Sequence, residues 1–365
     1  MKRYFPLLLL IILFPITRVK CDFVKQEVDW FHLYGGSFSE SGVSITKSSD
    51  GGYFIVGSSN DRDPWWDIYV IKTDELGNEI WNNTYGNLRE SEQAYDHVLA
   101  ENDGLVIIGI KDRDNATKKN ILVVKISKDG DLLWNQTYGS ERIEEGRSII
   151  ISSEGGFILT GSQSGTGPTE TDIIVMKIDD NGNLLWNSTI EQIGHEIGAS
   201  IIESSNGGYI ITGSISRPEL ESDLYLVKIN NTGSVLWNRT FGDSGYNITY
   251  RLYPQDQGKF VGEDDEGNII VMGQTQSFGA SDLDILVLKL DSEGYLIWKK
   301  LLGGEDQDGI GNGVIIKDGF IVVGSTNSFG AGINDDVLIY KLYANGSINW
   351  MMTFGAEGID RGFDV

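Results

Sequence analysis

The sequence predicts an all-β protein, a β-propeller of four-stranded antiparallel blades. One observation is a row of seven tryptophans spaced 51, 53, 52, 51, 61 and 52 residues apart: Trp30, Trp81, Trp134, Trp186, Trp237, Trp298 and Trp350. Another is that runs of Val, Ile, Leu and Tyr alternate with Gly, Asn and Asp turns, whereas no stretch after residue 22 has helical periodicity. Repeats of about 50 residues with four strands each are typical of a propeller, in which stacked blades bury one another's faces.

Each repeat reads as four strands in a fixed order, as the third repeat shows. The first strand is the run 148–152, and a Gly-rich turn leads to a second strand that ends at Gly161. The third strand covers 172–178, and the turn 180–183 leads to a fourth strand at 184–186. Six repeats follow this order, so we expect six complete blades.

Three residues keep fixed distances from the tryptophan in six repeats. A glycine lies four residues before it, a lysine nine before it, and Asp or Asn fourteen before it, as at Gly182, Lys177 and Asp172 before Trp186. We expect the tryptophan to anchor the packing between blades, because a large aromatic ring buries much area. A ligand-binding array of tryptophans is the alternative. The lysine is expected to be solvated, or to pack its stem and keep its amine in water.

The two ends of the chain predict an incomplete seventh blade within a single domain at residues 28–365. The N-terminal end supplies a fourth strand, Asp29 to Tyr34, and the C-terminal end stops inside a first strand, Asp360 to Val365. A fourth strand cannot pair with a first strand when the two middle strands are missing. We therefore expect the natural chain to continue for at least about 30 residues.

The hairpin before the tryptophan carries a family resemblance. It reads D-x-x-G-x-x-x-W in three repeats, with Asn230 replacing Asp in a fourth and with Ser127 and Tyr343 as departures. This resembles the tryptophan-docking motif of quinoprotein-like (PQQ-type) propellers. The fuller text W-N-x-T-[YF]-G, followed by a Gly-Gly turn, resembles secreted propeller repeats of archaeal and some bacterial surface proteins. The resemblance covers about residues 28–365 and implies fold and location but no activity, since propellers host many functions.

Residues 1–21 predict a secretory signal peptide. Lys2 and Arg3 precede an apolar run at 4–16 that is too short to span a bilayer. Cleavage is expected after Cys21, and an uncleaved anchor is the alternative. No later segment is apolar enough to span, so we expect a secreted or surface-displayed chain whose mature form has no membrane span.

Composition excludes several classes of function. Acidic residues outnumber basic ones by 53 to 29, which disfavours a nucleic acid or an anionic lipid as partner because phosphates need a basic face. A single cysteine excludes a disulfide scaffold and a multi-cysteine zinc site. Three scattered histidines, His32, His97 and His195, leave little room for a metal cluster or a Ser/His/Asp grouping. No cofactor is evident, although calcium is possible.

One acidic residue per repeat recurs at spacings of 52, 52, 52, 60, 52 and 52: Glu40, Glu92, Glu144, Glu196, Asp256, Asp308 and Asp360. All precede a first strand, so we expect a ring near the mouth of the propeller channel. In one interpretation each carboxylate accepts backbone N–H groups and ties neighbouring blades together. In the other, the ring is an anionic mouth for a polyhydroxy ligand or for a cation such as calcium.

Two loops that depart from the repeat form the candidate ligand-binding site. The first repeat has two tryptophans in a loop, and the fifth repeat has an insertion with three tyrosines and an arginine. Aromatic rings beside carboxylates and an arginine are typical of sugar or peptide recognition, and ordinary loop packing is the alternative. The residues are Trp65, Trp66, Tyr246, Tyr250, Arg251 and Tyr253.

Eight N-x-[ST] sequons predict glycosylation if the chain is exported. Four of them directly follow the repeated tryptophan, where the threonine has the alternative role of an ordinary strand residue. The asparagines are Asn82, Asn115, Asn135, Asn187, Asn230, Asn238, Asn247 and Asn345.

Together these observations predict a secreted or cell-surface propeller that acts as a binding or adhesion module for a glycan, a protein or a cation. The alternative is an enzyme, either quinoprotein-like or acting on glycosides through the carboxylates at the channel mouth. A glycosidase needs two carboxylates that flank the bond, and acidic residues are abundant here.

Overall fold

The computed structural model describes residues 7–9, 32–36, 39–60, 65–113, 119–140, 142–165, 170–216, 222–242, 255–280, 282–330, 334–355 and 358–365. Strands dominate these residues, and a single 3-10 turn lies at Glu101–Asp103. The chain divides into two compact units, which are described separately. Unit 1 holds residues 1–33, 216–226 and 237–365, and unit 2 holds residues 34–215 and 227–236. The predicted single domain over 28–365 stays a prediction.

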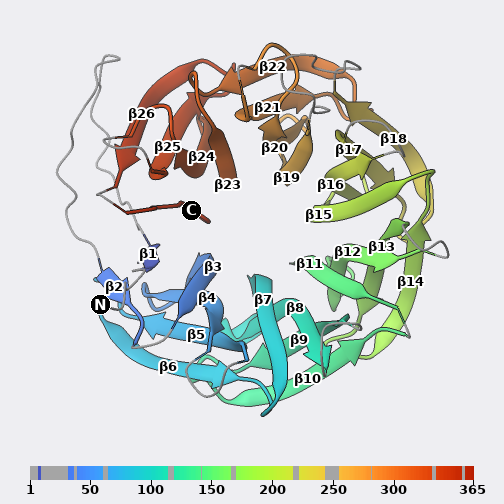
Figure 1. Ribbon diagram of the computed structural model, residues 1–365. Helices are drawn as coiled ribbons and strands as arrows, with labels where there is room; N and C mark the ends of the chain where they lie inside the picture. Colours follow the sequence, from blue (N-terminus) through green and yellow to red (C-terminus); the bar gives the residue numbers. More distant parts are fainter. Residues whose placement is uncertain are drawn as a thin grey trace. The chain divides into compact units, whose positions relative to one another are not determined.

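Unit 2 is a succession of antiparallel meanders. Its strands are β3 (Glu40–Lys47), β4 (Tyr53–Ser59), β5 (Asp67–Thr73), β6 (Glu79–Tyr85), β7 (Glu90–Leu99), β8 (Leu105–Arg113), β9 (Lys119–Ile126), β10 (Leu132–Tyr138), β11 (Glu144–Ile151), β12 (Phe157–Ser164), β13 (Thr171–Ile178), β14 (Leu184–Ile190), β15 (His195–Glu203) and β16 (Tyr209–Ser216). Within this unit the first strands β3, β7 and β11 lie side by side, and the fourth strands β6, β10 and β14 lie at the opposite edges of their sheets (Figure 1).

Unit 1 repeats the same meander. Its strands are β19 (Gln257–Glu263), β20 (Ile269–Thr275), β21 (Asp284–Leu290), β22 (Leu296–Leu302), β23 (Asp308–Ile316), β24 (Gly319–Thr326), β25 (Asp336–Tyr343) and β26 (Ile348–Phe354). Strands β17 (Ser222–Ile229) and β18 (Val235–Phe241) contain residues of both units. A separate two-stranded sheet pairs β1 (Leu7–Leu9) with β2 (His32–Tyr34).

The middle strands of each sheet form the core because both of their faces are covered. In unit 2, Ile108 and Ile121 of one sheet belong to the same buried cluster as Leu159 and Met176 of the next. In unit 1, a corresponding cluster joins residues of β20 and β21 with residues of β24 and β25. Strands buried on both faces read as nearly continuous apolar runs, which is why the second and third strands lack a polar alternation.

The predicted count of six complete blades and a partial seventh is wrong. The strands form four separate four-stranded sheets, namely β3–β6, β7–β10, β19–β22 and β23–β26, and one eight-stranded sheet that contains β11–β18. A parallel bridge between Thr171 of β13 and His195 of β15 joins the third and fourth repeats. The repeat text specifies hairpins, but it contains no signal for a backbone pairing between the loops of consecutive repeats.

The predicted partial seventh blade also differs from the structure. The expected first strand at Asp360 to Val365 is not formed, since residues 358–365 contain no strand, although the Gly362 N–H donates to Gly324 O at 3.1 Å. Strand β2 pairs with β1 instead of closing a blade. Most of the predicted signal peptide, together with Trp30, lies outside the described residues.

The repeated lysine is buried in four repeats, contrary to the expectation of a solvated side chain. The amine of Lys177 donates to Ser152 Oγ at 3.0 Å and pairs with Glu154 at 3.1 Å. Lys289 pairs with Asp264 at 2.8 Å in the same way. Lys72 pairs with Asp50 at 2.7 Å and Lys228 donates to Ser204 Oγ at 3.0 Å, so each of the four buried lysines reaches from the third strand to the turn that joins the first two strands of its own repeat. Lys125 instead donates to Asp180 O, in a turn of the next repeat, at 3.3 Å.

Candidate functional site

The tryptophan of one repeat lies against the turn glycine of the next repeat. A methyl group placed on Gly182 would lie 3.0 Å from Trp134, and one on Gly233 would lie 3.0 Å from Trp186. Both glycines also have a φ near +80°, a conformation that a side chain disfavours. These tryptophans are half-buried, as are Trp81, Trp237, Trp298 and Trp350.

A tyrosine reaches the same glycine turn in three repeats. The hydroxyls of Tyr34, Tyr85 and Tyr138 donate to the carbonyls of Gly77, Gly130 and Gly182 at 2.5, 2.7 and 2.5 Å. Burial raises the pKa of Tyr34 to about 12, so its hydroxyl keeps the proton that it donates. In these three repeats the tyrosine at the end of the tryptophan strand therefore bonds to the turn of the next repeat.

The periodic acidic residues begin the first strands and link consecutive repeats through their backbones. The N–H of Glu92 donates to Trp66 O at 2.6 Å, and that of Asp308 donates to Leu283 O at 2.6 Å. The same link recurs from Asp256 to Ser222 O and from Asp360 to Asp335 O. In each case the acceptor immediately precedes the third strand, or its aspartate, of the preceding repeat.

Five of these acidic side chains, Glu92, Glu144, Glu196, Asp256 and Asp308, are buried. Glu40, Glu144, Glu196 and Asp308 each accept an N–H from the residue four positions earlier, as from Ser140 to Glu144 at 3.0 Å. Asp256 instead accepts bonds from Thr275, Gln276 and Ser277. These carboxylates therefore accept hydrogen bonds from nearby backbone N–H and hydroxyl groups.

A second acidic residue, for which the sequence pattern indicated no role, meets this carboxylate in three repeats. A methyl group placed on Gly303 would lie 2.1 Å from Asp284 Oδ1 and 3.0 Å from Asp308 Oδ2. Equivalent glycines bring together Asp67 with Glu92 and Asp223 with Asp256, whereas Asn120 accompanies Glu144. The sequence signal that could have identified this second residue is the Asp or Asn that lies fourteen residues before the tryptophan in six repeats.

These acid pairs leave carboxylate oxygens without hydrogen bonds. Among the described residues, Asp284 Oδ1, Asp308 Oδ1, Glu92 Oε2 and Glu144 Oε2 are buried and accept none. Burial, with the neighbouring charge of Asp308, raises the pKa of Asp284 to about 6. Burial also raises the pKa of Glu92 and of Asp256, although nearby Lys111 or hydroxyl donors oppose it.

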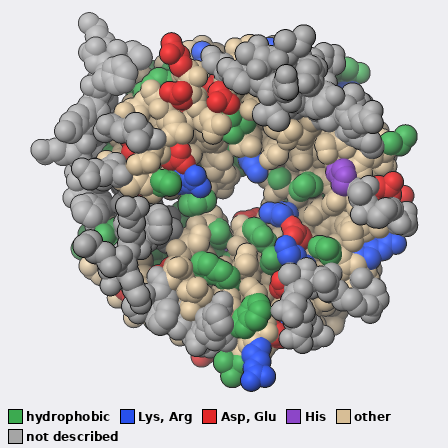
Figure 2. All heavy atoms as spheres, in the orientation of Figure 1, with side chains coloured by type: hydrophobic (Ala, Val, Ile, Leu, Met, Phe, Trp, Pro, Cys, Tyr) green, Lys and Arg blue, Asp and Glu red, His purple; other side chains and the backbone are tan. Residues whose placement is uncertain are grey.

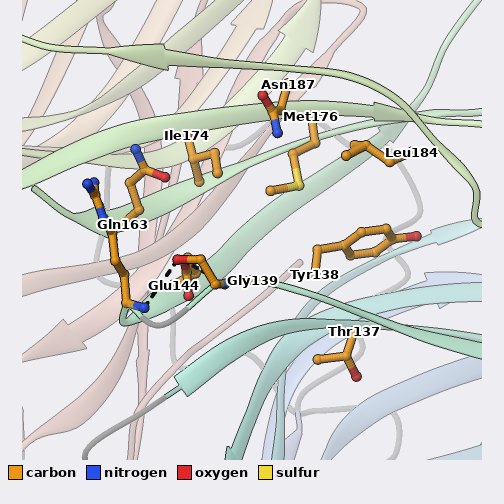
Figure 3. A pocket seen from close by; sticks show the side chains of 11 residues that line it. Thr137, Tyr138, Gly139, Glu144, Gln163, Ile174, Met176, Leu184 and Asn187 are labelled. Carbon is orange, nitrogen blue, oxygen red and sulfur yellow. Dashed lines mark hydrogen bonds between the residues drawn. The ribbon is translucent and has the colours of Figure 1, made fainter.

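A pocket of about 520 Å³ with both polar and apolar lining residues opens beside Glu144 in unit 2. Figure 3 shows Gln163, Ile174 and Met176 on one side and Tyr138, Gly139 and Glu144 opposite them. The Glu144 carboxylate is fixed by the Ser140 N–H and hydroxyl, and the Gln163 amide donates to Thr189 Oγ1 at 2.9 Å. The remaining lining residues are Thr137, Ser140, Arg142, Leu184 and Asn187.

The first repeat contains an equivalent pocket of about 370 Å³. Glu40, Ser59, Tyr69 and Asn82 stand there at the repeat positions of Glu144, Gln163, Ile174 and Asn187. The pocket is therefore a feature of the repeat, formed where a loop between repeats meets the second, third and fourth strands of the repeat that follows.

The structure places only part of the predicted aromatic loop site. Trp65 and Trp66 are half-buried just before β5, and neither lines the two pockets described above. Tyr246, Tyr250, Arg251 and Tyr253 lie outside the described residues, so the predicted site stays a prediction.

The acidic character of the chain is not gathered into one field on the face that Figure 2 shows, where acidic, basic and apolar side chains are intermixed. Within the part of the chain that the structure describes, no group of three or more His, Cys, Asp or Glu side chains is arranged to hold a metal ion. Over the same residues, no helix has the length and apolarity needed to cross a membrane.

Comparison with known proteins shows the fold. No family model matches the chain, and no curated protein matches it. A periplasmic gluconolactonase of Pseudomonas aeruginosa is 12% identical with a TM-score of 0.59, and the match covers 88% of this chain and 87% of the gluconolactonase. A puromycin hydrolase is 12% identical with a TM-score of 0.57, over 90% of this chain and 48% of the hydrolase. Both are β-propeller proteins, so the chain has a propeller-like fold.

Proposed function

We propose that the protein is an exported binding module that holds a hydroxyl-rich ligand, a glycan, in the pocket beside Glu144. The observation that carries the proposal is the lining of that pocket. A carboxylate, the amide of Gln163 and the guanidinium of Arg142 surround it, and Tyr138 adds an aromatic ring. Sugar hydroxyls both donate and accept, so a site that mixes fixed acceptors with fixed donors suits them.

The number of carboxylates at this pocket favours binding over glycoside hydrolysis. Hydrolysis by the usual route needs two carboxyl groups on opposite sides of the bond. Glu144 is the single carboxylate among the described residues that line the pocket. Its Oε1 is already engaged by the Ser140 N–H and hydroxyl, which suits a fixed acceptor better than a proton shuttle.

The proposal is tested on the mature protein with an array of neutral and acidic oligosaccharides, followed by calorimetry on any that bind. Exported protein with the substitution Asn187→Gln is used, because Asn187 heads a sequon and lines the pocket, and the glycans at the other sequons are kept. We expect Gln163→Ala and Arg142→Ala to weaken binding at least about tenfold, which corresponds to about 1.4 kcal/mol. Gln136→Ala, an exposed glutamine on β10, is the matched control. Binding that survives both pocket variants, or no binding to any glycan, contradicts the proposal.

Export belongs to the same proposal and is supported by the basic and short apolar start of the chain. The protein is then secreted or displayed at the cell surface, as its resemblance to archaeal and bacterial surface propellers implies. Intact-mass analysis of protein recovered from the outside of the producing cell tests this. A mass that lacks residues 1–21 is expected, and retention of the full chain inside the cell contradicts it.

A second candidate function is calcium binding at the acid pairs, favoured by the unpartnered oxygens of Asp284 and Asp308. Carboxylate oxygens are the ligands that calcium prefers. The test compares thermal unfolding in CaCl₂ and in NaCl at equal ionic strength. We expect a larger rise of the midpoint with calcium and a smaller calcium effect in Asp284→Asn. Equal curves in the two salts contradict this function.

A further inference from the structure

The fourth strand of each sheet is an edge strand with exposed apolar side chains. Among the described residues, strands β6, β10, β14, β18, β22 and β26 each pair with one neighbouring strand. The two residues before the tryptophan are exposed in every one of these except β26, where the second is half-buried. Leu133, Leu185 and Leu236 each expose 56% of their surface. An apolar side chain is thus presented beside an unpaired row of backbone donors and acceptors.

Such an edge is a template for pairing with another chain. The β14 segment Leu-Leu-Trp-Asn-Ser-Thr-Ile is uncharged, lacks Pro and Gly, and is rich in residues that favour strands. The β10 and β18 segments are nearly the same. Natural sheet proteins protect edges of this kind with charges, bulges or a covering group. Strands β10 and β14 have a bulge just before the tryptophan, but their residues from the tryptophan onward pair in regular register. Except for Arg239 on β18, the side chains of these three strands supply no charge.

A sequon stands on four of these strands at the same position. Asn82, Asn135, Asn187 and Asn238 directly follow the tryptophans of β6, β10, β14 and β18, and each asparagine is exposed. A glycan attached there would cover the middle of the strand, next to the exposed residues that precede the tryptophan, which are apolar except for Glu79 of β6.

The two remaining edge strands support the same interpretation. At the sequon position β22 carries Lys299 and Lys300, and lysine is the commonest charge used to guard an edge. Strand β26 has no sequon after its tryptophan, but exposed Asn345 heads one in the turn that begins the strand. Each edge strand thus has either a sequon or a pair of lysines close to its apolar residues.

We propose that Asn-linked glycans on β6, β10, β14 and β18 protect these edges and keep the protein from associating through its fourth strands. The proposal uses the export argued above, because N-glycosylation follows export. The glycans cover the exposed edges of these four strands, whereas the lysines of β22 protect its edge by their charge. This gives the repeated sequons a function that belongs to the sheet edges and does not involve ligand binding.

The first experiment uses the exported protein from a glycosylating host. Peptide mass mapping gives the occupancy of the four asparagines, and size-exclusion chromatography with light scattering gives the mass in solution. We expect occupied sites and a monomer, whereas the variant with Asn→Gln at all four positions should at least about double its average mass. Unoccupied sequons in exported protein, or a monomeric Asn→Gln variant, overturn the proposal.

The second experiment separates edge protection from export and from folding. The chain from residue 22 onward is made in a host without N-glycosylation, with wild-type sequence or with Asn→Lys at the four positions. The lysines reproduce the charge that Lys299 and Lys300 provide on β22. We therefore expect the lysine variant to be monomeric and the unglycosylated wild-type protein to associate. Circular dichroism should show that both are folded. Equal association of the two folded proteins overturns edge protection. A retained signal peptide in the first experiment overturns export instead.

Discussion

At the scale of the residue, a buried carboxylate is stable only when its oxygens have partners or when it keeps its proton. Asp256 takes the first course, with two hydroxyls and a backbone N–H as donors. Asp284 has one oxygen without a hydrogen bond and lies close to Asp308, so burial and the neighbouring charge raise its pKa to about 6. Two residues at related places in the repeat therefore differ in how readily they give up a proton.

Replacing Asp284 by Asn should stabilise the protein at neutral pH. The pKa of the folded carboxyl lies above its unfolded value of 3.8, so ionisation costs stability as the pH rises through about 6. We expect Asp284→Asn to raise the free energy of unfolding by about 1 to 3 kcal/mol at pH 7.5 and to have little effect near pH 4. Urea denaturation at both pH values measures this. Asp265→Asn, on an exposed turn, is the control, and an equal gain at both pH values contradicts the account.

His97 should make the folded protein sensitive to mild acid. Its ring is buried in β7, neither ring nitrogen has a hydrogen-bond partner among the described residues, and burial lowers its pKa from 6.5 to about 4. Between about pH 6.5 and pH 4, His97 is therefore protonated in the unfolded chain but not in the folded chain. The free energy of unfolding falls as the pH is lowered through this range. We expect the difference in the free energy of unfolding between His97→Leu and wild type to be about 2 kcal/mol more favourable to the variant at pH 5 than at pH 7. Chemical denaturation at the two pH values tests this, and a constant difference would show that His97 does not titrate as proposed.

At the scale of the element, the turn before each fourth strand was predictable because one glycine meets two requirements. Its positive φ closes the turn, and its lack of a side chain leaves room for the tryptophan of the preceding repeat. The sequence reveals the recurrence of both residues. It does not reveal that the tyrosine four residues beyond the tryptophan donates to the same glycine's carbonyl, as from Tyr138 to Gly182.

Two glycines allow these requirements to be separated. Gly233 has a φ of +84° and faces Trp186, whereas Gly207 has a φ of +82° and would place a methyl group in open space. We expect Gly207→Ala to lower the free energy of unfolding by about 1 kcal/mol through backbone strain alone. Gly233→Ala should lower the free energy of unfolding by about 1 to 3 kcal/mol more, because the methyl group would lie 2.7 Å from Ser188 Cβ and 3.0 Å from the Trp186 ring. Equal losses measured by urea denaturation would mean that the close packing of Ser188 and Trp186 on this glycine contributes nothing.

At the scale of the whole molecule, the strands were predictable from the sequence, whereas the pairing of strands from different repeats into sheets was not. Periodic tryptophans, glycines and lysines identified each hairpin, because hairpins are built from residues close in the chain. The bridge from Thr171 to His195 and the reach of Lys177 to Glu154 depend on segments more than twenty residues apart. The pocket beside Glu144 shows the same limit, since the periodic acid was visible in the sequence but its neighbours Gln163 and Asn187 meet it only in the folded sheet.

The net charge of −24 gives a prediction for the molecule as a whole. Like charges repel more strongly in the compact state than in the expanded one, so self-repulsion destabilises the folded chain at low ionic strength. The screening length falls from about 30 Å at 0.01 M to about 8 Å at 0.15 M salt. We expect the unfolding midpoint at pH 7.5 to rise between these salt concentrations by about 2 to 4 °C for each kcal/mol of repulsion removed. Calorimetry in NaCl and in tetramethylammonium chloride checks this, because screening depends on ionic strength and not on the cation. A rise confined to one of the two salts would instead indicate a specific ion site, and an unchanged midpoint would show that the ion pairs of Lys72, Lys177 and Lys289 already balance the local charge.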